Sequence, residues 1–566
     1  MIYIYRFHKN IYSSILKKNK EENNIFSNIT SKSSKLEYIV YELKDFINLT
    51  SLKSNKLVTT LILVFSLLIK LLISNYGYSG KNNPPKYGDF EAQRHWMEVT
   101  VNLHIKDWYN NIDIYNPMSY WPIDYPPLSA YFAYFWGKIF EILSPNSIEL
   151  INSRGEESYS TVKLMRATVI ISDLLFFTLP VIILVNYIFL KLNKDSKHLS
   201  QINLIKIYIC LILVLFSPSL LIIDHGHFQY NCVMLGLFVI SLIFLINNNF
   251  EASIIFITMA INFKITALYY AFPYLIYCLY YTYKNYSLYK GMLKLFKYSI
   301  VFILTIIIIW MPWIYYNNYN SVINRIFPLW RGVFEDKVAS FWCTFNIFKK
   351  INTFKQNYLL FLSTSLTLIF CFPSLLIFKL DINSKEFKYY RNKMIIISIF
   401  TCSMSFFMFS FHVHEKTIML PVLAFCLCFD QLIELLPSFT MLSIFSLYPM
   451  LSREGLELPY ICLLITSFIF TKKISSNYYK LDKLICHQKK KIFSKGDCLL
   501  PSLFNILDYL NLIIIFTYHY YEINVKPPQR YPYLYPAINS AYCFLWFFIT
   551  YLSSVVKMIC ITNFET

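Results

Sequence analysis

The chain has 566 residues, of which 56% are hydrophobic and only 15% are charged, and its formal net charge at pH 7 is +19. Soluble globular domains carry about 25% charged residues, so this composition excludes an ordinary soluble protein. Most Lys and Arg residues lie in loops between apolar runs, a pattern that orients membrane proteins and argues against nucleic acid as a partner. We therefore expect an all-α polytopic membrane protein whose partner is the lipid bilayer.

In chain order, a polar and basic segment comes first and a long series of apolar runs follows. Residues 1–55 are expected to form a cytosolic basic tail, and 56–566 a single multi-span domain. Apolar runs of about 20 residues predict transmembrane helices, here about 14 of them. The runs lie near 57–74, 166–190, 203–223, 231–247, 251–264, 266–283, 298–315, 357–379, 393–411, 417–435, 437–450, 457–471, 503–520 and 540–560.

The loops on the two sides of these spans differ in composition. Basic loops fall on the side of the tail, which the positive-inside rule assigns to the cytosol. They are 191–206, 284–297, 379–393 and 472–495. The opposite side receives loops dense in carboxylates, histidines and aromatic residues, and we expect the function there. These loops are 75–163, 224–231, 315–356, 412–416 and 525–536.

The first string on that side is GDFEAQRHWME at 88–98, within the first loop at 75–163. Its apolar residues fall on one stripe of a helix and its charged residues on the other side, which predicts a helix lying in the membrane interface. Asp89 stands at the expected start of this helix, where position alone favours an N-cap. A role as a general base stays open if one oxygen of Asp89 faces a cavity.

Two further strings occur before residue 232. In WPIDYPPL, at 121–128, Asp124 precedes two prolines and is expected in a turn or in binding. In DHGHFQYN, at 224–231, His225 and His227 follow an Asp, which raises the question of a metal. Because a third spaced ligand is lacking, we expect no metal and favour polar contacts to a sugar or to neighbouring loops.

Two more strings follow in the second half of the chain. Arg331 and Glu335 belong to RGVFEDK at 331–337. FHVHEK, at 411–416, contains His412, His414 and Lys416, and its histidine spacing is not that of the HExxH zinc motif. Loop packing of the histidines and snorkelling of the lysine are the structural alternatives to a functional role.

Taken in order, the five strings closely resemble the dolichyl-phosphate-glucose-dependent α-1,3-glucosyltransferases of the N-glycan pathway. The resemblance spans about 88–420 and includes a weaker match at Asn262-Phe263-Lys264. The run AQRH after Asp89, and Gly226 in DHGHF, are closer to the members that add the first glucose to the Man9GlcNAc2 acceptor than to those that add the second.

The resemblance implies a GT-C fold and a reaction in the endoplasmic reticulum lumen. It implies a dolichyl-phosphate-glucose donor, a dolichyl-diphosphate-linked oligosaccharide acceptor, inversion at the glucose C1, and neither a nucleotide sugar in the lumen nor a cofactor. The family's general base corresponds to Asp89. Such a base is expected because a sugar hydroxyl is a poor nucleophile near neutral pH.

The other candidate site residues follow from the needs of the reaction. Cations should stabilise the charge that develops on the leaving phosphate. The donor-phosphate and substrate-binding candidates are Arg94, Arg331, His412, His414, Lys416, Asp124, His225, His227 and Glu335, with Asp124, His225 and Glu335 proposed to distinguish the acceptor sugar.

Three alternatives remain open at this point. The chain could be the second glucosyltransferase of the pathway, a mannosyltransferase of the same fold, or a transporter or non-catalytic scaffold. A transporter should carry ionisable residues in mid-span or Gly- and Pro-broken helices. Here the ionisable strings cluster at span ends, and the chain has only 11 Gly, so an enzyme is favoured.

Overall fold

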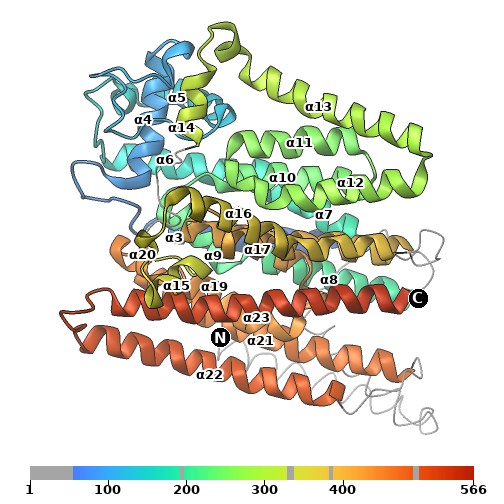
Figure 1. Ribbon diagram of the computed structural model, residues 1–566. Coiled ribbons are helices and arrows are strands. Elements are labelled where there is room, and N and C mark those ends of the chain that lie inside the picture. The colour runs from blue at the N-terminus through green and yellow to red at the C-terminus, as the bar shows by residue number, and fades with distance from the viewer. Residues whose placement is uncertain (1–54, 191–196, 328–336, 381–386, 489–495, 566) are drawn as a thin grey trace. The chain divides into compact units, whose positions relative to one another are not determined.

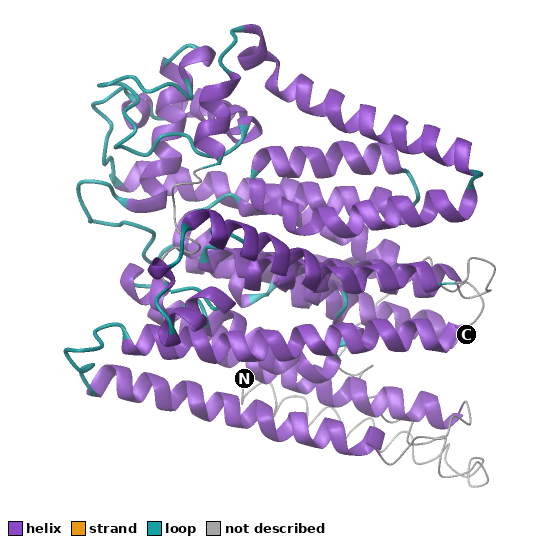
Figure 2. Cartoon of the chain, in the orientation of Figure 1, coloured by secondary structure: helices purple, strands orange, loops and turns teal. Residues whose placement is uncertain are grey.

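The computed structural model describes residues 55–190, 197–327, 337–380, 387–488 and 496–565. Within these ranges the chain is helical, with loops and no strand (Figure 2). Thr59–Ser475 and Gly496–Thr566 form one compact unit, to which all the side chains discussed below belong. The helix ends 55–58 and 476–488 are the described parts of a second unit.

Among the described residues, ten α-helices lie between Asn55 and Asn285 and two more follow before residue 327 (Figure 1). They are α3 (Asn55–Ile73), α4 (Gly88–Asn102), α5 (Pro127–Leu143), α6 (Tyr159–Ser172), α7 (Leu179–Leu190), α8 (Lys197–Leu215), α9 (Pro218–Leu221), α10 (Asn231–Ile246), α11 (Phe250–Phe263), α12 (Ala271–Asn285), α13 (Leu288–Tyr315) and α14 (Tyr319–Ile326).

The second half continues with longer helices and short turns. The helices are α15 (Phe341–Phe348), α16 (Gln356–Cys371), α17 (Phe387–Phe409), α18 (Met419–Leu427), α19 (Leu436–Phe445), α20 (Tyr448–Leu451), α21 (Glu457–Gln488), α22 (Gly496–Asn524) and α23 (Leu534–Glu565). The turns that matter for the site are the π-helices η4 (Asp173–Thr178) and η5 (Ile222–Phe228) and the 3-10 helices η9 (Glu415–Ile418) and η12 (Ser452–Glu454).

Helix starts follow local chemistry that the sequence displays. α5 begins at Pro127, where the missing N–H of proline costs nothing because the first N–H groups of a helix have no intrahelical partner. α6 is capped by Ser158, whose side chain accepts from the N–H of Thr161. Asn249 caps α11 in the same way through the N–H of Ala252.

The multi-span, all-α character expected from the sequence is confirmed. Within the described residues, seven helices are long and apolar enough to cross a membrane, or eight if the bent pair Asn203–Leu215 and Pro218–Phe228 forms one span. The seven are Tyr159–Ile188, Leu288–Tyr315, Gln356–Lys379, Tyr390–Phe409, Ile433–Glu454, Glu457–Tyr478 and Leu534–Thr562. Other expected runs form shorter or broken helices, such as Asn231–Ile246 and Phe250–Phe263.

The first loop folds into a small helical layer rather than into a surface helix. α4 packs against α5, and both lie with α14 at one end of the helices α10–α13 (Figure 1). Ser129 of α5 donates a hydrogen bond to the carbonyl of Phe263, where α11 ends. Trp96 of α4 donates through its indole N–H to the carbonyl of Trp121, at 3.1 Å.

The helix predicted over the GDFEAQRHWME string is confirmed, and the structure shows in addition that its charged side is buried within the protein. Glu91, Arg94 and Glu98 are all at most 1% exposed. Arg94 donates to Glu91 at 2.6 Å and 2.7 Å and to Glu98 at 2.7 Å, and its Nη1 reaches the Ser147 carbonyl at 2.8 Å and the Ser153 hydroxyl at 2.6 Å. The charged face can be buried because its charges neutralise one another.

Candidate functional site

The start of α4 places Asp89 next to a second backbone segment. Tyr87 and Gly88 have φ values of 56° and 63°, and a Cβ added at Gly88 would lie 2.6 Å from the carbonyl carbon of Ser79. Only glycine satisfies both the left-handed backbone and this close approach. As a result the N–H of Asp89 donates to the Ser79 hydroxyl at 3.1 Å.

The side chain of Asp89 does not cap α4. Tyr87 occupies the N-cap position without a side-chain cap bond, and the Asp89 carboxylate turns away from the helix. Its Oδ2 accepts from Lys416 Nζ at 2.7 Å, lies 2.9 Å from His227 Nε2, and accepts from the Gln229 amide. The capping alternative is therefore wrong, because three partners from distant strings take the carboxylate instead.

The two oxygens of Asp89 differ in their surroundings. All three of these contacts converge on Oδ2, whereas Oδ1 makes no hydrogen bond to any of the described residues. The side chain is 24% exposed, so it is neither enclosed nor fully in solvent. Among the described residues, one oxygen of Asp89 is thus held by three side chains and the other has no donor.

The π-helix η5 presents His227 to Asp89, and its backbone is fixed on several sides. The carbonyl of His227 accepts from the N–H of Ser79 at 3.0 Å. Arg166, 5% exposed, donates to the carbonyls of His225 and Gly226 at 2.7 Å and 2.8 Å. A charged donor to two carbonyls is a strong anchor for this turn.

The second ring nitrogen of His227 contacts another carboxylate. His227 Nδ1 lies 2.8 Å from each oxygen of Glu454, which is the last residue of η12. His227 Nε2 also lies 3.2 Å from Lys416 Nζ. His227 therefore lies between two carboxylates and beside one cation.

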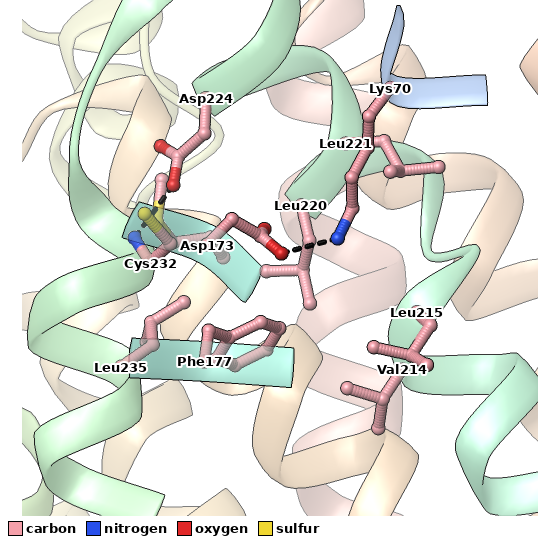
Figure 3. Close-up of a pocket in the computed structure, with 11 residues that line it drawn as sticks. Lys70, Asp173, Phe177, Val214, Leu215, Leu220, Leu221, Asp224, Cys232 and Leu235 are labelled. Carbon is pink, nitrogen blue, oxygen red and sulfur yellow. Dashed lines mark hydrogen bonds and ion pairs between the residues drawn. The ribbon is translucent and has the colours of Figure 1, made fainter. Parts of the chain in front are cut away.

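His225, expected to bind substrate, points into the core instead. It is 1% exposed, and its Nε2 lies 3.2 Å from Asp173. Asp173 in turn accepts from Lys70 and from Thr178. Figure 3 shows the ion pair of Lys70 and Asp173 beside Asp224, in a pocket lined otherwise by apolar residues.

A third cation lies on the other side of Gln229. Lys264 donates to the side-chain oxygens of Gln229 at 3.1 Å and of Asn231 at 2.7 Å. Its ammonium also lies 4.9 Å from the centre of the Tyr125 ring, which neighbours the half-buried Asp124 in sequence. Gln229 thereby links Lys264 to Asp89, and the WPIDYPPL string borders the same small pocket.

The FHVHEK string contributes Lys416 directly to the site. His412 has a φ of 59°, and its ring packs edge to face on that of His414, with ring centroids 4.9 Å apart. Arg331 and Glu335 lie outside the described residues. Of the predicted residues, the structure thus brings Asp89, His227 and Lys416 together and places Arg94 and His225 in buried networks of their own.

The charges around Asp89 decide its protonation. Burial favours the neutral acid, but the charge of Lys416 and the contacts with His227 and Lys416 together outweigh burial and hold the pKa of Asp89 well below its usual value. Burial likewise opposes the charged form of Lys416, yet the Asp89 carboxylate raises the pKa of Lys416. Both groups are therefore ionised near neutral pH.

Several residues of the site were missed in the sequence. Glu454 and Lys264 are single charged residues outside the five strings, although Lys264 belongs to the weaker match at 262–264. Lys70 and Asp173 lie inside or at the end of apolar runs, where an ionisable residue is itself a signal of function.

Comparison with known proteins agrees with the family resemblance. The model of the ALG6, ALG8 glycosyltransferase family matches residues 63–553. A probable dolichyl pyrophosphate Man9GlcNAc2 alpha-1,3-glucosyltransferase of Dictyostelium discoideum is 35% identical, over 88% of this chain and 95% of its own length. Proteins named dolichyl pyrophosphate Man9GlcNAc2 alpha-1,3-glucosyltransferase in Gallus gallus and Saccharomyces cerevisiae are 32% and 34% identical, each over 88% of this chain and over 96% and 91% of their own lengths.

Proposed function

Since this chain belongs to the ALG6, ALG8 glycosyltransferase family, we propose that it adds the first glucose to a dolichyl-pyrophosphate-linked Man9GlcNAc2 oligosaccharide. The donor is dolichyl-phosphate-glucose, the new bond is α-1,3 to a terminal mannose, and the reaction takes place in the lumen of the endoplasmic reticulum. The names and the coverage of the relatives support the acceptor and the linkage.

One observation carries the chemical part of the proposal. The carboxylate of Asp89 is ionised and held through Oδ2, while none of the residues that the structure describes donates to Oδ1. A general base must hold its catalytic oxygen within hydrogen-bond reach of the proton that it abstracts. Oδ1 of Asp89 has the freedom to take the proton of the acceptor hydroxyl.

The proposed transfer is a single displacement at C1 of the donor glucose. The oxygen of the mannose 3-hydroxyl forms a bond to C1 of glucose on the face opposite the phosphate, and its proton passes to Asp89. The bond between C1 and the phosphate oxygen breaks, and dolichyl phosphate leaves with the electron pair. Inversion of the β-linked donor gives the α-linked product, and cations offset the charge that develops on the phosphate.

Lys416 connects donor binding with the basicity of Asp89. As long as Lys416 is paired with Asp89, the low pKa makes the carboxylate a weak base. A donor phosphate that takes over Lys416 removes this cation from Asp89, and the pKa of the carboxylate rises toward the range in which general bases are efficient. The base is thus strengthened when the donor is in place.

The remaining candidates keep the roles expected from the sequence, except where a described contact indicates another role. Arg331, His412 and His414 are proposed for the donor phosphate, and Asp124 and Glu335 for the acceptor sugar. His227 is proposed to orient Asp89, which it contacts. A different role is proposed for Arg94 and His225, because each is paired with a buried carboxylate. We propose that they position the backbone around the site.

The GT-C fold and the topology are part of the same proposal. We infer about 14 spans with both termini in the cytosol, because the basic loops alternate with the carboxylate-rich ones. The helices Asn231–Ile246 and Phe250–Phe263 support this number, since each coincides with an apolar run although it is too short for the stricter criterion. The site strings then open to the lumen.

A donor competition with the purified chain tests the proposed function. Dolichyl-phosphate-glucose, dolichyl-phosphate-mannose and a nucleotide-activated glucose are each offered with the glucose-free acceptor. We expect transfer from dolichyl-phosphate-glucose alone. Transfer of mannose, or of glucose from the nucleotide sugar, would contradict the proposed donor.

A further inference from the structure

We propose that Glu454 is a positioning residue of the transfer reaction, acting through His227 on Asp89. The inference rests on the proposed function and deepens it, because it assigns a role to a residue outside all five strings. Glu454 accepts the Nδ1–H of His227, so the ring is fixed with Nε2 toward Asp89. Asp89 in turn is held through Oδ2, with Oδ1 presented to the acceptor hydroxyl.

The geometry is a continuous chain of three side chains. Each carboxylate oxygen of Glu454 lies 2.8 Å from His227 Nδ1, and His227 Nε2 lies 2.9 Å from Asp89 Oδ2. The side chain of His227 is 2% exposed and that of Glu454 is 10% exposed, so water competes little with these contacts. The three residues are 138 and 227 positions apart, so only the fold brings them together.

Glu454 is itself fixed by a tight backbone contact. A Cβ added at Gly77 would lie 1.9 Å from the carbonyl oxygen of Glu454, so the two backbone segments touch in a way that only glycine allows. The carbonyl of Gly77 accepts from Arg166 at 2.9 Å, and the same guanidinium holds the turn that carries His227. Arg166 therefore ties the segment at Gly77, which Glu454 touches, to the turn at His227.

The chemistry of imidazole explains why a carboxylate is needed here. A ring nitrogen that faces a carboxylate donates a proton, so Nδ1 donates to Glu454, Nε2 donates to Asp89, and the ring of His227 carries both protons. The charged groups that face His227 are Asp89, Glu454 and Lys416. With Nδ1 fixed, Nε2 is directed at Asp89 and Lys416, and the ring cannot turn away without losing the Glu454 contacts.

The test is a double-mutant cycle on the full chain. Initial rates are measured with dolichyl-phosphate-glucose and the glucose-free acceptor for Glu454→Gln, Glu454→Ala, His227→Ala and the double variant Glu454→Ala with His227→Ala. Glu457→Gln is the matched control, because Glu457 is an exposed glutamate three positions further along. Thermal unfolding of each purified variant is followed in parallel.

We expect Glu454→Ala to lower kcat by about 10-fold to 100-fold, the range in which residues that orient a functional histidine act, with the KM for the donor unchanged. Glu454→Gln should lose less, because its amide oxygen still accepts the Nδ1–H. In the His227→Ala background, Glu454→Ala should lower kcat no further, because the effects of substituting two coupled residues are not additive. A merely structural glutamate would instead lower stability and add its cost in both backgrounds.

Three results would overturn the inference. They are a Glu454→Ala variant as active as the Glu457→Gln control, costs of Glu454→Ala and His227→Ala that multiply, and a loss confined to the KM for the donor. If Glu454→Ala does not fold, the cycle is run with Glu454→Leu, whose side chain cannot accept the Nδ1–H, and the same outcomes decide. An inactive wild-type chain would remove the proposed function and this inference together, whereas an active wild type with unaffected variants removes the inference alone.

Discussion

Lys416 Nζ lies 2.7 Å from Oδ2 of Asp89, although 327 positions separate the two residues in the chain. The contact joins the loop at 75–163 to the short turn η9 that precedes α18. It keeps the carboxylate ionised and leaves its second oxygen open.

Asp89→Asn should abolish glucose transfer while the chain still folds and binds the donor. The amide keeps the size of the side chain but cannot take up a proton, and loss of a general base costs about 10²–10⁴-fold in rate. Single-turnover transfer and donor binding are measured on the same preparation. Asp113→Asn, at an exposed position of the same loop, is the control and should transfer normally. Near-normal turnover by the Asp89 variant would exclude the residue as the base.

Lys416→Gln should shift the acid limb of the pH profile of kcat/KM toward higher pH. In the wild type, the pKa of Asp89 lies well below its usual value, so the base stays ionised across the neutral range. Without the charge of Lys416, the effect of burial dominates and the pKa of the Asp89 carboxylate rises. As the pH is lowered, activity then begins to fall at a higher pH than in the wild type. Lys355→Gln, an exposed lysine, serves as the control. Acid limbs that coincide in the wild type and the Lys416 variant would argue against the pairing.

Arg94→Ala should destabilise the chain rather than weaken donor binding. The change leaves Glu91 and Glu98 buried without their cation, and breaking a buried ion pair in this way costs about 3–5 kcal/mol. Denaturant unfolding of the detergent-purified protein measures the loss, with Arg530→Ala at an exposed position as the control. A stable variant with a lowered affinity for dolichyl-phosphate-glucose would instead support a binding role.

The sequence anticipated the centre of the site better than its surroundings. Asp89, His227 and Lys416 could be assigned because they stand in long, unusual strings that resemble one family. Glu454 could not, because a single glutamate in a short turn has no pattern of its own. Even so, simple alternation of the expected spans places the turns after 264 and at 451–456 on the side where we expect the function, which makes Lys264 and Glu454 candidates.

The fold shows the same division between local and tertiary information. The periodicity of 88–102 was sufficient to predict α4, but not that its charged face is buried. That outcome depends on Arg94 meeting Glu91 and Glu98 on one side and Ser147 and Ser153 on the other. The local sequence does not show which distant residues a side chain will contact. Because charged residues are rarely buried without partners, the sequence alone does not predict the burial of this face.

Engineered glycosylation sites test the topology. Acceptor sequons placed within 75–163 and within 315–356 should be modified, because these loops are inferred to face the lumen. One placed within 472–495 should stay unmodified on the cytosolic side. The size shift that an endoglycosidase removes reports each site. Modification of the last loop would reverse the inferred orientation.

The choice of acceptor distinguishes an enzyme that adds the first glucose from one that adds the second. The purified chain is given dolichyl-phosphate-glucose with either a glucose-free Man9GlcNAc2 lipid or the same lipid that already bears one glucose, and the products are weighed by mass spectrometry. Polar groups that form hydrogen bonds with a terminal mannose would be left without partners by a terminal glucose. This difference lets an enzyme discriminate strongly between the two acceptors. We expect the glucose-free acceptor to gain the mass of one hexose and the acceptor that already bears one glucose to gain none. Transfer only to the acceptor that already bears one glucose would contradict it and would identify the enzyme as the second glucosyltransferase.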